Sequence, residues 1–200
     1  MLWSIVIPVK GAVGKSRLDA GDARAALSVA FARDAITAAV AAESVARVVV
    51  VTGDADVARD LAVETVDDPG TGLAAAIRTG IAALDDGQPA AVMLGDLPAL
   101  TPGALDEALA MAEREGRSYV PDALTTGTTL LAARRADALR PHFGPGSAEL
   151  HRLAGHVALP VAPDSGLRVD VDELADLHLA IDLGVGEHTQ AVLRAARLAA

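Results

Sequence analysis

Lys10 and Lys15 are the only lysines of this 200-residue chain, and both lie with Arg17 in one short segment near the N-terminus. The chain as a whole is acidic, with a formal net charge of −10. A local group of three cations can neutralise a polyphosphate, and Gly11 and Gly14 would let the backbone approach it closely. We therefore expect this segment to bind the phosphates of a nucleotide, although a solvated loop could have the same composition.

The Gly-Lys-Ser sequence at 14–16 also ends the P-loop of many NTPases, whose pattern is G-x-x-x-x-G-K-[ST]. Here Val9 occupies the position of the first glycine. In a P-loop the Lys-Ser pair begins a helix, whereas residues 19–22 have no helical pattern. The sequence therefore argues against a P-loop NTPase and favours a different phosphate-binding loop, after the first strand of an α/β sheet.

Carboxylates that could hold a divalent cation occur at two places. Asp96 follows a buried apolar run in GDLPAL, and Asp170 and Asp172 lie in RVDVDELADL, between a short strand and a helix. Mg²⁺ prefers oxygen ligands, and open α/β sheets bind ligands at the carboxyl ends of their strands. Asp96 and Asp172 are therefore the expected Mg²⁺ ligands. Asp96 could instead cap the next turn, and Asp172 could cap the helix that follows it.

The glycine-rich turn FGPGS, at 143–147, is a third candidate site. Ser147 would begin a short helix, whose first backbone N–H groups favour an anion. Gly144 would allow the backbone to come close to that anion. A plain turn with a serine cap would explain the same residues. The turn is therefore a candidate site for a second, anionic substrate.

The apolar runs predict the elements that position these residues. In the first half we expect strands at 2–9, 47–52, 64–66 and 90–94, and helices at 23–42, 55–61, 73–84 and 102–115. Thr101 would cap the last of these helices. After residue 116 we expect strands at 118–120, 128–133, 156–161 and 167–169, a helix at 148–153 and helical structure over the last thirty residues. Uniformly apolar strands that alternate with helices predict one α/β domain over residues 1–200, with a mostly parallel sheet flanked by helices.

Composition excludes several classes of function. The chain has no cysteine, which rules out disulfides, thiolate chemistry and cysteine-ligated zinc. Its negative charge argues against nucleic-acid or membrane partners. The five histidines have no metal-ligand spacing, so we interpret them as surface or packing residues, and no G-x-S-x-G motif supports a serine hydrolase. Without a targeting segment or a long apolar stretch, the sequence predicts a cytoplasmic protein.

Several motifs together resemble one enzyme family. In chain order they are IPVKGAVGKSRL, the GL that closes DDPGTGL, GDLPAL, TTGTTLL, FGPGS and RVDVDELADL. They are similar to those of the guanylyltransferase that activates a small phosphorylated acid in the biosynthesis of the 5-deazaflavin coenzyme F-420. The similarity covers nearly the whole chain. It implies a single-domain, GT-A-like (Rossmann-like) nucleotidyltransferase. Residues from about 1 to 116 would bind GTP, and residues from about 117 to 200 would bind the acceptor.

The resemblance implies a definite reaction and a set of site residues. GTP and phosphoenolpyruvate would give enolpyruvyl-2-diphospho-5'-guanosine and pyrophosphate, with Mg²⁺ as the cofactor. The guanine would lie near residues 52–54 or against residues 70–73. The implied catalytic residues are Lys10, Lys15, Arg17 and Asp96; the nucleotide-binding residues are Lys10, Gly11, Gly14, Lys15, Gly72 and Asp96; the acceptor-binding residues are Thr129, Gly144 and Ser147; and the Mg²⁺ ligands are Asp96 and Asp172.

The sequence departs from the family pattern at two points. Leu73 and Ala74 follow Gly72 where the pattern has Gly-Leu-Asn, and Thr125 stands where the pattern has glycine.

Several alternatives remain open: 2-phospho-L-lactate or 3-phosphoglycerate as the acceptor, a nucleotidyltransferase acting on molybdopterin or a sugar phosphate, and a nucleotide-binding module without catalysis. The sequence does not fix the oligomeric state, and a homo-oligomer is one option.

Overall fold

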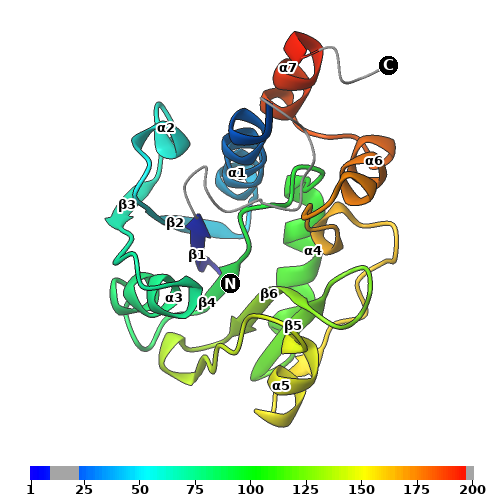
Figure 1. Cartoon of the computed structure of the whole chain (residues 1–200). Coiled ribbons are helices and arrows are strands. Elements are labelled where there is room, and N and C mark those ends of the chain that lie inside the picture. The colour runs from blue at the N-terminus through cyan, green and yellow to red at the C-terminus, as the bar shows by residue number, and fades with distance from the viewer. Residues whose placement is uncertain (10–22, 197–200) are drawn as a thin grey trace.

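Seven strands form one sheet in the order β3-β2-β1-β4-β6-β5-β7 (Figure 1). The strands are β1 (Trp3–Val9), β2 (Val45–Thr52), β3 (Glu64–Asp67), β4 (Ala90–Met93), β5 (Arg117–Pro121), β6 (Thr128–Ala133) and β7 (Val157–Ala158). All neighbouring strands are parallel except β6, which is antiparallel to β4 and β5. The predicted α/β fold with a mostly parallel sheet is therefore confirmed.

The computed structural model describes residues 1–9 and 23–196. Lys10, Gly11, Gly14, Lys15 and Arg17 lie outside the described residues, so their expected roles remain predictions. Among the described helices, none is both long and apolar enough to cross a lipid bilayer.

Helices cover both faces of the sheet, which explains why its central strands, such as β1 and β4, are apolar and buried. The helices are α1 (Arg24–Ala41), α2 (Ala55–Ala58), α3 (Leu73–Ala82), α4 (Pro102–Ala112), α5 (Ser147–Leu153), α6 (Leu174–Leu183) and α7 (Glu187–Ala196), with 3-10 turns η2 (Ala136–Ala138) and η3 (Gly166–Arg168). Ile5 and Ile7 of β1 pack under α1 and α4, whereas Val6 packs against α3 on the other face. All three side chains are fully buried, as a parallel strand between two helical layers requires. Thr101 caps α4 as predicted, because its hydroxyl accepts the N–H of Ala104 at 3.2 Å.

The last two helices pack beside α1 and form a third apolar cluster with it (Figure 1). Asp34 of α1 fixes this arrangement, since its two carboxylate oxygens accept the backbone N–H groups of His188 and Thr189 at 2.9 Å each. These N–H groups belong to the first turn of α7, where they have no partner within the helix. A side chain from a distant helix therefore caps the C-terminal helix.

The predicted strands at 156–161 and 167–169 are largely wrong. Only Val157–Ala158 forms a strand, and residues 166–168 form the 3-10 turn η3. The side chain of Arg168 replaces the missing ladder, because its guanidinium donates to the carbonyl oxygens of Pro121 at 3.1 Å and Asp122 at 2.8 Å. This segment is thus attached to the sheet by a buried arginine and not by strand pairing.

Candidate functional site

A cavity of about 520 Å³ opens at the carboxyl edge of the sheet, where the strand order reverses between β1 and β4. Val9, at the end of β1, and Asp96, just after β4, both line it. Open α/β sheets bind ligands at such a switch point, because the loops that leave the two strands diverge there. Ser28 of α1 also lines the cavity, so the described residues on both sides of segment 10–22 reach the same site.

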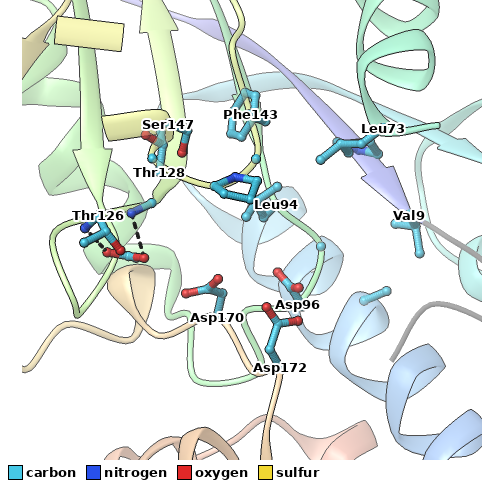
Figure 2. A pocket seen from close by; sticks show the side chains of 18 of the residues that line it. Val9, Leu73, Leu94, Asp96, Thr126, Thr128, Phe143, Ser147, Asp170 and Asp172 are labelled. Atoms are coloured by element: carbon cyan, nitrogen blue, oxygen red, sulfur yellow. Dashed lines mark hydrogen bonds between the residues drawn. The ribbon is translucent and has the colours of Figure 1, made fainter. Parts of the chain in front are cut away.

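Four aspartates line this cavity, and three of them, Asp96, Asp170 and Asp172, come together at one side of it (Figure 2). The backbone N–H of Val171 donates to the carbonyl oxygen of Asp96 at 3.0 Å, which holds the segment 170–172 against the end of β4. Burial and then the neighbouring charge of Asp96 raise the pKa of Asp170 to about 7. Such a rise is the mark of carboxylates that repel one another in a partly dehydrated site. A bound cation would relieve that repulsion.

The donor set fits Mg²⁺, which usually takes one or two carboxylates together with substrate phosphates and water. Within residues 1–9 and 23–196, no group of three or more His, Asp or Glu side chains is arranged to hold a metal ion by itself. The site therefore fits a cation that is shared with a bound triphosphate. Asp172 does not cap α6, contrary to one alternative from the sequence, because Glu173 is the N-cap in a capping box with Asp176. Mg²⁺ binding by Asp96 and Asp172 stays a prediction.

The start of α3 contributes the apolar side of the cavity. Leu73 lines it, and Figure 2 shows this side chain near Val9. Gly72, directly before it, has a φ of +105°, a conformation that strains residues with a side chain. Of the two segments that we expected near the guanine, 70–73 has one residue, Leu73, on the cavity. Gly72 is not among the lining residues, and its binding of the nucleotide stays a prediction.

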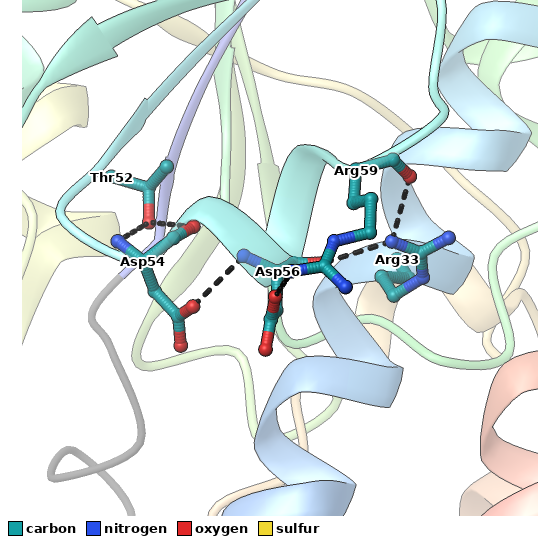
Figure 3. Close-up of polar contacts among 5 residues, drawn as sticks. All are labelled: Arg33, Thr52, Asp54, Asp56 and Arg59. Carbon is teal, nitrogen blue, oxygen red and sulfur yellow. Dashed lines mark hydrogen bonds and ion pairs between the residues drawn. The ribbon is translucent and has the colours of Figure 1, made fainter.

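The other segment, residues 52–54, uses its polar groups for local structure (Figure 3). The hydroxyl of Thr52 accepts the N–H of Asp54 at 3.0 Å, and Asp54 in turn accepts the N–H of Asp56 at 3.0 Å to cap α2. Arg33 closes the other end of α2, donating to the carbonyl oxygens of Asp56 at 2.8 Å and Arg59 at 2.9 Å. These contacts brace the loop after β2.

The loop at 122–127, between β5 and β6, forms another wall, and Asp122 organises it. One carboxylate oxygen accepts the N–H of Thr126 at 2.9 Å, and the other accepts the N–H of Gly127 at 2.8 Å (Figure 2). A Cβ on residue 127 would lie 2.4 Å from Oδ2 of Asp122, so any larger residue there would displace this carboxylate. Thr125 has a φ of +62°, a region that a β-branched residue rarely adopts. The glycine of the family pattern would adopt it without strain.

Strand β6 presents Thr128 to the cavity and turns Thr129 away from it. Thr128 lines the cavity, whereas Thr129 is fully buried, with its hydroxyl 3.5 Å from the carbonyl oxygen of Val120. Successive side chains of a strand point to opposite faces. A shift of β6 by one residue would therefore exchange the threonine that faces the cavity. Acceptor binding by Thr129 stays a prediction, and Thr128 is a further candidate that our sequence analysis missed.

The turn at 143–147 lies on the cavity as expected. Phe143, Gly144 and Ser147 all line it, and Ser147 begins α5. However, the N–H of Ser147 donates to the carbonyl oxygen of Gly144 at 3.0 Å, and that of Ala148 to the carbonyl oxygen of Thr126 at 3.1 Å. The first two amides of this short helix are therefore engaged within the protein. The expectation that they favour an anion is not supported, and the hydroxyls of Ser147 and Thr128 are the better candidates.

Comparisons with known proteins agree with this site and fold. Residues 29–157 match the MobA-like NTP transferase domain. A phosphoenolpyruvate guanylyltransferase from Streptomyces scabiei is 45% identical over 213 residues, which cover 99% of this chain and 98% of that protein. A nucleotidyl transferase from Methanothermobacter has a TM-score of 0.63 at 20% identity, covering 91% of this chain and 97% of its own. A 4-diphosphocytidyl-2C-methyl-D-erythritol synthase from Anaerococcus prevotii has a TM-score of 0.61 at 10% identity, covering 90% and 94%. The two structural likenesses show the fold alone.

Proposed function

Since the chain belongs to the phosphoenolpyruvate guanylyltransferase family of nucleotidyltransferases, we propose that it transfers GMP from GTP to the phosphate of phosphoenolpyruvate. The products are enolpyruvyl-2-diphospho-5'-guanosine and pyrophosphate. The observation that carries this proposal is one cavity, lined by Asp96, Asp172 and Ser147, which opens at the ends of β1 and β4. Groups suited to a cation and to an anion therefore lie in a single site.

The two halves of the chain supply the two sides of this site. From the first half come Val9, Leu73 and Asp96, which we assign to the GTP side. From the second half come Thr128 and Ser147, which we assign to the acceptor. We further propose that Lys10, Lys15 and Arg17 neutralise the triphosphate, because Val9 and Ser28, near the two ends of their segment, line the cavity.

The chemistry requires little beyond positioning and charge neutralisation. A phosphate oxygen of the acceptor attacks the α-phosphorus of GTP, the bond to the β-phosphate oxygen breaks, and pyrophosphate leaves. The attacking oxygen is already anionic near neutral pH, so no general base is needed, and alignment of the two phosphates contributes much of the rate. Bound Mg²⁺, held by Asp96 and Asp172, would offset the charge of the phosphates.

The proposal is tested by pyrophosphate release. We expect release only when GTP, Mg²⁺ and phosphoenolpyruvate are all present, with the guanylated acid identified by mass spectrometry. Parallel reactions with 2-phospho-L-lactate and 3-phosphoglycerate decide the acceptor, and reactions with CTP and UTP decide the base. Absence of release in every mixture would contradict the proposal, and faster release with CTP or UTP would assign the chain to another nucleotidyltransferase activity.

A further inference from the structure

His151 is a buried histidine with no part in the reaction described above. It lies behind the side of the cavity that we call the acceptor wall, which consists of the loop 122–127, Thr128 and the turn at 143–147. It lies on α5, one turn after Ser147, and its side chain has 0% exposure. Its ring meets Phe143 edge-on, with the ring centroids 5.2 Å apart, and Phe143 lines the cavity. The interpretation of the histidines as surface or packing residues is therefore incomplete for this one.

The hydrogen bonds of His151 define its tautomer. Its Nε2 lies 2.8 Å from the backbone nitrogen of His142, and that N–H can only donate, so Nε2 must be the unprotonated, accepting nitrogen. The ring proton is then on Nδ1, which lies 2.9 Å from the hydroxyl oxygen of Thr128. Burial, with smaller contributions from His156 and His142, lowers the pKa of His151 to about 4, so the neutral ring is the form present near neutral pH.

This tautomer determines what Thr128 can do. Because Nδ1–H of His151 donates to the hydroxyl oxygen, the hydroxyl proton of Thr128 must point elsewhere. Among the described residues, the Thr128 hydroxyl bonds only to His151, so its proton has no acceptor there, and Thr128 lines the cavity. Thr128 is thus held as a donor toward the cavity, which Ser147 also lines (Figure 2). A donor fixed in this way suits an anionic oxygen of a ligand.

We propose that His151 is a positioning residue for the acceptor. Through Nδ1–H it orients the Thr128 hydroxyl toward an anionic phosphate or carboxylate oxygen, and through Nε2 it anchors the backbone that leads from His142 into the turn at 143–147. One ring therefore connects the two segments that face the acceptor, β6 and the glycine-rich turn. This inference rests on the proposed function for the identity of the anion, which is phosphoenolpyruvate.

Two substitutions separate the two halves of this role. In His151→Asn, the side-chain amide can still donate to Thr128 but no longer reaches the N–H of His142. In His151→Gln, the longer side chain can accept from His142 but no longer places a donor at Thr128. Thr128→Val removes the hydroxyl itself. His156→Asn is the matched control for packing, because His156 is also buried, at 3% exposure, and its ring meets that of His151 edge-on at 5.8 Å. Its Nδ1 bonds to the carbonyl of Ser118, so the variant leaves both hydrogen bonds of the His151 ring in place.

The test measures KM for phosphoenolpyruvate, KM for GTP, kcat and Tm for each variant. Removing a hydrogen bond to a charged ligand costs about tenfold or more in binding, so we expect at least that rise in KM for phosphoenolpyruvate in Thr128→Val and His151→Gln. In His151→Asn, KM for phosphoenolpyruvate should rise by less than about threefold. KM for GTP should not change in any of these variants. The double variant Thr128→Val with His151→Gln should be no worse than Thr128→Val alone. His156→Asn should lower Tm without changing KM.

A binding measurement keeps this inference separate from the proposed function. Phosphoenolpyruvate is titrated by calorimetry into each protein loaded with Mg²⁺ and α,β-methylene-GTP, which cannot react. If the wild-type chain releases no pyrophosphate but the same pattern appears in binding, the proposed function fails and the role of His151 stands. The role is overturned if Thr128→Val binds as the wild type does, if His151→Asn and His151→Gln weaken binding equally and in step with Tm, or if the wild type does not bind phosphoenolpyruvate.

Discussion

Val171 donates its backbone N–H to the carbonyl oxygen of Asp96 at 3.0 Å, and this bond joins two distant parts of the chain at the cavity. Asp96 lies just after β4, and Asp172 follows Val171 directly. The two expected Mg²⁺ ligands are therefore brought together by tertiary structure, with no local spacing that would reveal the pair. Their proximity makes the metal site testable by single substitutions.

Asp96→Asn should abolish turnover while the fold persists. The amide keeps the shape of the side chain but loses the charge that would hold Mg²⁺ against the phosphates, and we expect a loss of at least about 100-fold in kcat. The measurement is pyrophosphate release over a Mg²⁺ titration, with Tm as the check on folding. Asp182→Asn is the control, because Asp182 is an exposed residue of α6. Full activity of Asp96→Asn at low Mg²⁺ would contradict the role of Asp96.

Much of the fold was predictable because the sheet is buried on both faces. Strands such as β1 and β6 consist of consecutive apolar or small residues, and their predicted and observed bounds differ by at most one residue. The segment 167–169 could not be predicted in this way. Its apolar residues indicated a strand, but Arg168 makes its hydrogen bonds to Pro121 and Asp122 through its side chain. A sequence pattern does not show where a side chain replaces the backbone.

Site residues could be predicted where a suitable side chain stands at the start or end of a predicted element. They were harder to predict where the register of a strand decides which residue faces the cavity. Asp96 stood out because it follows a predicted strand, and Ser147 because it begins a predicted helix, and both line the cavity. Thr128 and Thr129 are adjacent and chemically identical, so only the register of β6 distinguishes them. No sequence pattern pointed to His151, because its proposed role depends on a tautomer that the backbone N–H of His142 fixes.

Gly127→Ala should damage the acceptor wall. The new methyl group would lie 2.4 Å from Oδ2 of Asp122, so the Asp122 carboxylate should move and lose at least one of the two hydrogen bonds that it accepts. We expect KM for phosphoenolpyruvate to rise about tenfold, in line with one lost charge-assisted bond, with KM for GTP little changed. Gly116→Ala is the control, since a methyl group there would meet open space. Equal kinetics for both variants would show that the loop tolerates the displacement.

Thr125→Gly should stabilise the protein, although it removes a side chain. Thr125 has a φ of +62°, and relief of that strain should outweigh the greater freedom of glycine in the unfolded chain, for a net gain of about 1 kcal/mol. Urea unfolding measures the change. Asp60→Gly is the matched control, because Asp60 has a φ of +60° and aspartate adopts this region more readily. Asp60→Gly should therefore lose stability. If Thr125→Gly destabilises the protein as much as Asp60→Gly does, the strain argument is refuted.

Acid should weaken the fold through the buried histidines. Burial lowers the pKa of both His151 and His156 to about 4, so between pH 6.5 and 4 the unfolded chain binds protons that the folded chain does not. Their stabilisation is complete above pH 6.5 and is lost as the pH falls toward 4, by up to about 3 kcal/mol for each histidine. Asp170 acts in the opposite sense, because its raised pKa of about 7 favours the folded state as the pH falls.

The contribution of one histidine is isolated by comparing variants. The difference in unfolding free energy between the wild type and His156→Asn should shrink as the pH falls from 7 to 4, whatever Asp170 contributes to both proteins. His178→Asn, at an exposed site of α6, is the control for the substitution itself. If the curves of the wild type and His156→Asn run parallel over this range, His156 does not titrate as a buried neutral ring.

Asp34→Asn should release the C-terminal helix α7 from α1. The carboxylate accepts two backbone N–H groups, from His188 and Thr189, whereas an asparagine would turn one NH₂ donor toward them. Loss of this cap should cost about 1–2 kcal/mol, measured by urea unfolding against the exposed-site variant Asp182→Asn. Hydrogen exchange localises the effect: amides of α7 should lose protection first, while those of β1 keep theirs. Uniform loss of protection would mean that Asp34 supports the whole core and not one helix.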